Sequence, residues 1–461
     1  MSGPRTPAVE PPPADRVATG AAGGRILLRG AFTIAALSAL FGAVSLLRDQ
    51  ATAYLFGSGP SVEAFVVAFA VPVFLINTVS GVLAPVFTPI LMRIRHQGDE
   101  ATVADFFAAV LSASAAVGVA VCLLLAIAAP VAMPLLAPGF DQPTTDLAIR
   151  LLYWLLPSVA MSGAAYLWMA LLNADRRFAV AAFAPTLQPV GALLVVAVFG
   201  RRFGIESMAV GYTLGTVAQV MLLGWAASRR GYSSRLTPRW ASPHMAELRR
   251  HYTTLFLGSL LMGSTTLVNQ AMATMISPGA VSRFAFANVP VMFVLGLGAR
   301  TVGQVLLPHF SHFAAAGEWP ELRREAVRAF VVTFAASAGG AAFVVVAAQP
   351  IVRILFERGA FTPEDTTAVA RILRFLALQI PFYVCGIVTA RLLTALQMTG
   401  HMFWIAALGL LLTVGLNLAL MPWLDIAGIA LAVAIVNAVC VGLSLAAAMR
   451  RLRAPAIEPR S

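Results

Sequence analysis

The stretch RDQATAYLFGSGPSVEAFVVAFAVP, from Arg48 to Pro72, joins the first two long apolar segments of the chain. Arg48 and Asp49 stand near the end of the first segment, and Glu63 opens the second. The residues of Gly57–Pro60 predict a tight turn between them. Charge at the mouth of a membrane-spanning helix is costly, so such charges usually pair with one another or line a watery cavity. The alternative interpretation is that they are interfacial loop charges beside a helix-start glutamate.

The composition of the whole chain is that of a membrane protein. Of its 461 residues, 59% are apolar and only 11% are charged, and the mean hydropathy is +0.84. Soluble proteins carry about 25% charged residues. The 32 basic residues are all arginines, and they lie in short connections between apolar segments. A nucleic-acid-binding domain would instead gather its basic residues on one face. The sequence therefore predicts an all-α polytopic membrane protein without a nucleic-acid partner.

A membrane-spanning helix needs about 20 predominantly apolar residues. By that measure the chain contains about twelve transmembrane helices, near residues 26–47, 62–91, 104–129, 146–172, 178–200, 207–227, 253–276, 281–307, 327–349, 366–394, 402–423 and 427–449. The more basic connections then alternate onto one side of the membrane, which the positive-inside rule assigns to the cytoplasm. We therefore expect both termini inside, with 1–24 as a disordered cytoplasmic tail and 450–461 as a second cytoplasmic tail.

The two halves of the chain resemble one another. VPVF at 71–74 has a counterpart in VPVM at 289–292, and TTDLAIRLLYWLLP at 144–157 has one in TTAVARILRFLALQIP at 366–381. The basic cytoplasmic linker 228–252 then separates an N-terminal six-helix lobe, 25–227, from a C-terminal six-helix lobe, 253–449. An even number of spans per half makes the repeat parallel, related by an axis along the membrane normal. Such a duplication is typical of transporters, whose substrate sites lie between the halves.

The chain has no recognisable catalytic motif. It contains no Walker A sequence, no serine–histidine–aspartate arrangement and no acidic cluster in a large loop, so we expect a transporter and not an enzyme. His309 and His312 have a spacing that could suit a metal, but no cysteine or carboxylate stands directly beside them. The cysteines at 122, 385 and 440 lie in apolar segments and are expected to be buried hydrophobic side chains. We therefore predict no metal and no cofactor.

Charged and amide groups within the spans are the remaining candidates for a substrate site. We predict that Arg48 and Arg300 face one cavity from opposite lobes, where guanidinium forks suit an anionic, diphosphate-like headgroup. Asp49 and Glu63 would balance these charges, and Asn77 would line the pathway. The alternatives are that Arg300 extends toward the cytoplasmic interface and that Asn77 is interhelical hydrogen-bonding glue.

Three stretches resemble the MurJ/MviN family of lipid II flippases, in the multidrug/oligosaccharidyl-lipid/polysaccharide exporter superfamily. They are the opening stretch 48–72, VLLPHFSHFAAAGE at 305–318 and PIVRILFERGAFTPEDT at 350–366, and the similarity runs in order from about residue 26 to 449. The resemblance implies two helical lobes that work by alternating access in the bacterial cytoplasmic membrane. It implies an undecaprenyl-diphosphate-linked glycan precursor, lipid II, as the substrate moved from the inner to the outer leaflet. A coupling ion (sodium or proton) or the membrane potential would reset the cycle.

Residue by residue, the resemblance assigns Arg48 and Asp49 to the family's Arg-Asp pair, and Glu63 to a position where the family usually has aspartate. It also implies membrane lipids and cell-wall synthesis proteins as partners. The chain departs from the family at further arginine positions, which fall on Gly42, on Ile76 and Asn77, and near Asn288 or Val289. It also ends after twelve spans, without the two C-terminal helices that in typical members help to form a groove for the lipid tail.

These departures leave three alternatives open. One is a flippase for another polyprenyl-linked oligosaccharide, such as an exopolysaccharide or O-antigen unit. Another is a cation-coupled drug exporter on the same scaffold, which would need an acidic residue deep in a lobe; no aspartate or glutamate lies mid-span. The third is a non-transporting scaffold of a glycan-assembly complex, which a vesicle flipping assay would distinguish from both transporters.

Overall fold

The computed structural model describes residues 18–97, 100–230, 232 and 243–453. Within these ranges, the structure describes the backbone alone for residues 18–32, 100, 243, 297, 299–305, 399 and 453. Most of the predicted tail 1–24, most of the tail 450–461 and much of the linker 228–252 therefore lie outside the described residues.

The described residues form helices joined by short turns, with no strand among them. The first half of the chain contains α1 (Ala18–Phe56), α2 (Pro60–Leu75), η2 (Ile76–Ser80), α3 (Leu83–His96), α4 (Glu100–Leu136), α5 (Gln142–Ala174), α6 (Phe178–Phe183), η3 (Ala184–Thr186), α7 (Leu187–Phe203) and α8 (Glu206–Ser228). The second half contains α9 (Pro243–Thr274), α10 (Ala280–Ala316), α11 (Trp319–Val346), α12 (Ala348–Phe356), α13 (Pro363–Ala377), α14 (Gln379–Ala395), α15 (Thr399–Leu424) and α16 (Ile426–Arg453).

Ten helical rods in the described part of the chain are long and apolar enough to cross a membrane. Three of them are stacked pairs, α2 with α3, α6 with α7 and α13 with α14, which each continue one rod through a break. Helices α9 and α10 have 32 and 37 residues but are not among the ten. In α10 the described run Ala280–Gly296 is apolar. The prediction of an all-α polytopic membrane protein is confirmed.

The second rod is broken by the π-helical turn η2, which lies between α2 and α3. A break of this kind leaves carbonyl groups without their usual partner, and in a membrane it persists only where a neighbour supplies one. Here α9 supplies it, because Ser259 Oγ donates to the Thr78 carbonyl at 3.3 Å and the Tyr252 hydroxyl donates to the Val79 carbonyl at 2.8 Å. Helix α9 thereby stabilises an irregular stretch of the first lobe.

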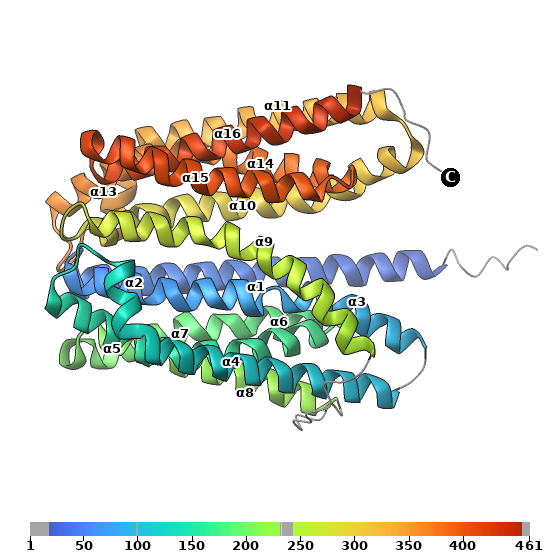
Figure 1. The fold of residues 1–461 in the computed structure, drawn as a ribbon, viewed down its shortest axis with the longest axis horizontal. Helices are drawn as coiled ribbons and strands as arrows, with labels where there is room; N and C mark the ends of the chain where they lie inside the picture. Colours follow the sequence, from blue (N-terminus) through green and yellow to red (C-terminus); the bar gives the residue numbers. More distant parts are fainter. Residues whose placement is uncertain (1–17, 98–99, 231, 233–242, 454–461) are drawn as a thin grey trace, which may run out of the picture.

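The helices pack into two lobes that come together at one end (Figure 1). At the end opposite the first residue of α1 and the last residue of α16, one continuous cluster of buried apolar side chains joins both lobes, with Val67 and Leu152 from the first and Phe286 and Phe356 from the second. At the end where α1 begins and α16 ends, each lobe has a separate cluster, one of them around Phe310 of the second lobe. We call these the far end and the terminal end. The lobes are therefore joined at the far end and separate at the terminal end.

Helix α9 passes from one lobe to the other (Figure 1). Near its start Met245 is buried in the apolar cluster of the first lobe, and Glu247 forms an ion pair with Arg93 of α3 at 3.0 Å. Near its end Asn269 accepts a hydrogen bond of 2.8 Å from Asn417 of α15. The first turns of α9 overlap the predicted linker, so residues 243–252 of that connection form a helix packed on the first lobe.

Candidate functional site

Hydrogen bonds between the lobes close the far end, and we call the residues that form them the far-end latch. Ser282 Oγ, in the first turn of α10, donates to the Ser58 carbonyl at 2.5 Å. Ser58 Oγ in turn donates to Asp365 Oδ1 of α13 at 2.5 Å. The backbone N–H of Ala360 donates to the Tyr54 carbonyl at 2.9 Å. The α1–α2 turn of the first lobe is thus held by two separate segments of the second.

Glu63 completes the far-end latch from α2. Its side chain is buried, with 3% exposed, and Oε1 accepts a hydrogen bond of 2.7 Å from the backbone N–H of Val281. Val281 lies in the first turn of α10, where N–H groups have no partner within the helix and carry a partial positive charge. The guanidinium of Arg283, on the same turn, adds a favourable charge interaction. A carboxylate of one lobe therefore caps a helix of the other.

Two turn glycines allow the backbones of the lobes to touch at the far-end latch. Gly57 has φ +62° and Gly359 has φ +64°, a region that side chains rarely adopt. A Cβ atom on Gly57 would lie 2.7 Å from the Ala360 carbonyl oxygen, and one on Gly359 would collide with the Tyr54 carbonyl oxygen. These positions therefore need glycine both for conformation and for space.

The sequence near Asp365 explains its orientation. Thr362 and Asp365 form a capping box at the start of α13, in which the Thr362 N–H donates to Asp365 Oδ2 at 3.1 Å and the Asp365 N–H donates to Thr362 Oγ1 at 3.3 Å. The other carboxylate oxygen, Oδ1, is thereby left for Ser58, and the Arg283 Nε lies 3.6 Å from it. A local helix start thus places the acceptor for a contact between lobes.

The predicted pair Arg48 and Asp49 lies on α1, about 9 Å along the helix from Tyr54 at a rise of about 1.5 Å per residue. Arg48 Nη2 and Nε both contact Asp49 Oδ1, at 2.6 and 3.0 Å. The two side chains are 19% and 20% exposed, so the pair is largely enclosed. The guanidinium also acts electrostatically on the hydroxyl of Tyr212 in α8. The structure brings these two predicted residues together inside the first lobe.

Polar residues of α7 and α8 extend this environment. The Tyr212 hydroxyl donates to Gln188 Oε1 at 3.2 Å, and Gln188 Nε2 donates to Thr216 Oγ1 at 3.4 Å. The ring of Phe69 packs edge-on against Tyr212, with centroids 4.8 Å apart. Tyr212 is not among the residues predicted from the sequence; the available signal was that Tyr212 and Thr216, four residues apart, share one face of a span. The first lobe therefore holds a connected polar interior beside Arg48.

The other predicted residues lie elsewhere. Asn77 is in the π-helical turn η2, and its side chain is exposed. Glu63 contacts the start of α10, as described above, and not Arg48. The backbone of Arg300 belongs to α10, but its side chain lies outside the described residues. The side chains of four of the five predicted residues are described, and among these four only Arg48 and Asp49 contact each other.

No group of three or more histidine, cysteine, aspartate or glutamate side chains suited to a metal occurs in the described part of the chain. His309 Nε2 lies 3.8 Å from Glu325 Oε2 across the α10–α11 hairpin. Cys385 is buried and Cys122 and Cys440 are half-buried, and all three are free thiols.

Comparison with known proteins identifies the family. Residues 52–458 match the family described as "Lipid II flippase MurJ". The chain belongs to this family. It is 27% identical over 383 residues to a "Probable lipid II flippase MurJ" of Synechocystis sp., a match that covers 80% of this chain and 71% of that protein. It is 28% identical over 415 residues to the protein of the same description from Rhizobium meliloti, covering 86% and 75%.

Solved structures share the fold. The structure titled "Lipid II flippase MurJ, inward closed conformation" superimposes with a TM-score of 0.78 at 20% identity, covering 90% of this chain and 87% of that one. An inward-facing multidrug resistance MATE family transporter has a TM-score of 0.77 at 16% identity, covering 92% and 98%. An outward-facing MATE family transporter has a TM-score of 0.63 at 18% identity, covering 93% and 95%. The MOP superfamily fold is therefore confirmed.

Proposed function

We propose that this chain is a lipid II flippase, which moves an undecaprenyl-diphosphate-linked glycan precursor from the inner to the outer leaflet by alternating access. Membership of the MurJ family supports the substrate. The observation that carries the mechanism is the single apolar cluster and latch at the far end, combined with separate clusters at the terminal end. A transporter closed at one end and parted at the other represents one of the two states that alternating access requires.

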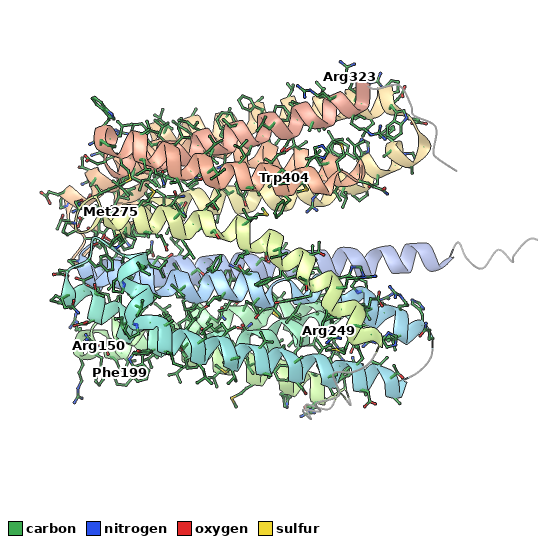
Figure 2. The ribbon with its side chains drawn as sticks, viewed as in Figure 1. Arg150, Phe199, Arg249, Met275, Arg323 and Trp404 are labelled. Atoms are coloured by element: carbon green, nitrogen blue, oxygen red, sulfur yellow. The ribbon has the colours of Figure 1, made fainter. Side chains whose placement is uncertain are left out.

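The chain is a multi-pass protein of the bacterial inner membrane, and we propose that its terminal end faces the cytoplasm. The arginine distribution supports this orientation, because the connections at the terminal end are the more basic. Arg249 and Arg323 lie at that end in Figure 2, and Arg150 lies at the far end. The parted side of the lobes would then receive substrate from the cytoplasmic leaflet, and the far-end latch would face outward.

In this proposal Arg48 contacts the diphosphate. Its contacts with Asp49 use Nε and Nη2, and a guanidinium has five N–H donors, so further donors remain for phosphate oxygens. Asp49 lowers the cost of enclosing the arginine when no substrate is bound, because the pair carries no net charge. Arg300 would supply the second cation from the other lobe, and Asn77 would line the pathway. Glu63 would act at the far-end latch, which must open to release substrate outside.

We further propose that a coupling ion, sodium or proton, or the membrane potential drives the return step. Membrane lipids and proteins of cell-wall synthesis are the proposed partners. Vesicles loaded with lipid II test the driving force directly: initial flipping rates are compared under a sodium gradient, a proton gradient and an imposed potential. If the flipping rate were the same under each of these three conditions as in vesicles without any gradient or potential, transport would not be coupled to an energy source.

The decisive experiment is complementation of a strain depleted of its lipid II flippase. Wild type and Arg202→Ala, an exposed arginine at the far end, are expected to rescue growth, whereas Arg48→Ala inserts normally and does not. Loss of a hydrogen bond to a charged group weakens binding by about 1.5–3 kcal/mol, which is about tenfold to a hundredfold. Normal rescue by Arg48→Ala would contradict the diphosphate contact. Failure of a well-inserted wild type, with flipping of another polyprenyl-linked oligosaccharide in vesicles, would reassign the substrate.

A further inference from the structure

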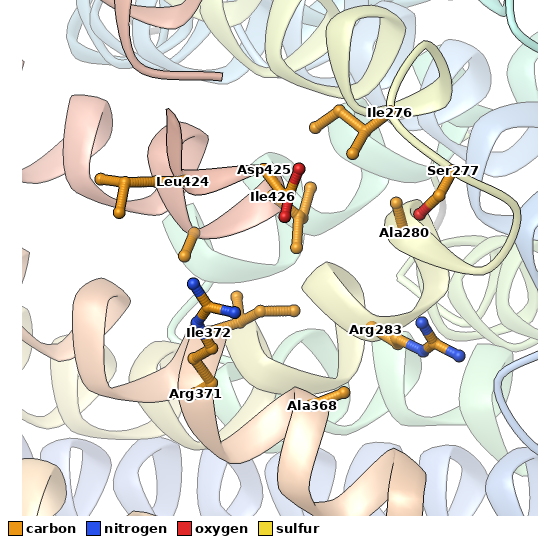
Figure 3. A pocket seen from close by; sticks show the side chains of 11 residues that line it. Ile276, Ser277, Ala280, Arg283, Ala368, Arg371, Ile372, Leu424, Asp425 and Ile426 are labelled. Carbon is orange, nitrogen blue, oxygen red and sulfur yellow. The ribbon is translucent and has the colours of Figure 1, made fainter. Parts of the chain in front are cut away.

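A cavity of about 280 Å³ lies at the far end of the second lobe, beside the far-end latch (Figure 3). Its walls come from the α9–α10 turn, from α13 and from the α15–α16 turn. Apolar side chains such as Ile276 and Ile372 line it together with three charged ones, Arg283, Arg371 and Asp425. The cavity is therefore amphipathic, and its charged groups come from three separate segments.

Arg371 and Asp425 are exposed, and neither side chain has a hydrogen-bond or ion-pair partner within the described ranges. Figure 3 shows Arg371 extending from α13 toward the turn that carries Asp425, while the guanidinium of Arg283 points to the other side. A positive and a negative group thus border the same cavity without neutralising each other. Arg283, the third charged residue of the lining, already has a partner, because its Nε lies 3.6 Å from Asp365 Oδ1.

The corresponding turn of the first lobe has no such arrangement. There Gly204 follows the last residue of α7, with φ 61° and ψ −149°, and in the second lobe Asp425 follows the last residue of α15, with φ 52° and ψ −136°. Glycine adopts this conformation without strain, whereas aspartate does not. Near Gly204, Arg150 and Glu206 form an ion pair, with 3.2 Å between Arg150 Nε and Glu206 Oε1. In the second lobe the strained residue is instead an aspartate that lines a cavity together with an unpaired arginine, and backbone strain of this kind concentrates at functional sites.

The position of the cavity indicates what it meets. Trp423, two residues before Asp425 at the end of α15, is 84% exposed. Exposed tryptophans of membrane proteins concentrate at the level of the lipid headgroups. A ligand at this level that has both a phosphate and an ammonium group matches the two charges, and the first methylene groups of its acyl chains match the apolar walls. Phosphate suits the fork of an arginine, and ammonium suits a carboxylate.

We propose that this cavity binds a zwitterionic phospholipid headgroup of the phosphoethanolamine type, with its phosphate on Arg371 and its ammonium on Asp425. The site is separate from Arg48 of the first lobe, which is proposed to contact the diphosphate of the flipped substrate. Its outer-leaflet location follows from the orientation proposed above, but the chemistry of the headgroup does not depend on it.

The test is native mass spectrometry of the purified full-length protein, titrated separately with phosphatidylethanolamine and phosphatidylglycerol. Wild type is expected to retain phosphatidylethanolamine in preference. Asp425→Gly, which also removes the backbone strain, is expected to keep the fold and weaken retention of phosphatidylethanolamine about tenfold, with little effect on phosphatidylglycerol. Arg371→Gln is expected to weaken both lipids. The matched control is Arg374→Gln, one turn along α13, which is exposed but does not line the cavity.

Two further outcomes would overturn the proposal. If Asp425→Gly retains phosphatidylethanolamine as wild type does, the carboxylate does not bind the ammonium group. If inorganic phosphate binds in an Arg371-dependent manner and phosphatidylethanolamine does not, the site takes a free anion and not a headgroup. Because retention is measured without transport, either result leaves the proposed flippase activity to its own test.

Discussion

Replacing Glu63 with alanine is expected to open the far end. The carboxylate accepts the N–H of Val281 at 2.7 Å in a buried setting, so its removal leaves a buried donor at a helix start without a partner. A hydrogen bond to a charged group contributes about 1.5–3 kcal/mol. Since the bond joins the two lobes, this whole amount is lost only from the latched state. The ratio of latched to opened molecules should therefore fall about tenfold to a hundredfold.

The distance between the lobes at the far end reports this ratio. Spin labels on Arg202 of the first lobe and Glu364 of the second, both exposed, would be introduced into a protein whose three cysteines have been replaced. Double electron–electron resonance should show a longer distance appearing in Glu63→Ala, and a smaller amount of it in Glu63→Gln, because the amide keeps an acceptor but lacks the charge.

The matched control is Glu206→Gln. It also removes a carboxylate at the far end, but Glu206 pairs with Arg150 of its own lobe. Its distance distribution should remain that of the unsubstituted protein. If Glu63→Ala gave the same distribution as Glu206→Gln, the cap across the lobes would not stabilise the latched state, and the reasoning would be wrong.

Two further predictions concern the turns at the far end. Gly359→Ala should increase the population with the longer distance in the same assay, because its Cβ would collide with the Tyr54 carbonyl of the other lobe. The control is Gly317→Ala, which has φ +72° and open space around it and should leave that population unchanged. Equal effects of the two substitutions would show that the close contact at Gly359 does not matter. The hydroxyl and backbone N–H of Thr144 hold the pKa of Asp141 below its usual range. The ionised Asp141 therefore stabilises the fold at pH values above the ordinary aspartate pKa, and this stabilisation is lost as the pH falls through the lowered pKa. The melting temperature of wild type should therefore exceed that of Asp141→Asn near neutral pH and approach it on acidification, and a gap that widens in acid would contradict the assignment.

Much of the fold could be predicted because it depends on local properties of the chain. The length and apolarity of each segment decide whether it can span a bilayer, and these can be read directly. The Arg48–Asp49 contact was also within reach, since the two residues are adjacent and share one helix. The turn at Gly57 was visible for the same reason, although its partner was not.

The contacts of the far-end latch could not be predicted in this way. Glu63 binds Val281, 218 residues away, through a backbone N–H that is chemically the same in every residue except proline. The hydrogen bond from the Ala360 N–H to the Tyr54 carbonyl likewise joins two backbone groups, so no residue type in the sequence indicates it. The charge of Glu63 marks it as a site candidate in the sequence, but its partner, a helix start of the other lobe, is visible only in the structure.

The sequence by itself determined that the chain crosses the membrane many times, that it is built from two similar halves and that charges interrupt its first hairpin. These features follow from composition and from interactions over a few residues. Only the tertiary structure decided which end of the lobes is closed, which donors Glu63 and Asp365 meet, and that Arg371 and Asp425 share a cavity. The reason is that two lobes can pack in more than one arrangement, and a small sum of long-range contacts selects between them.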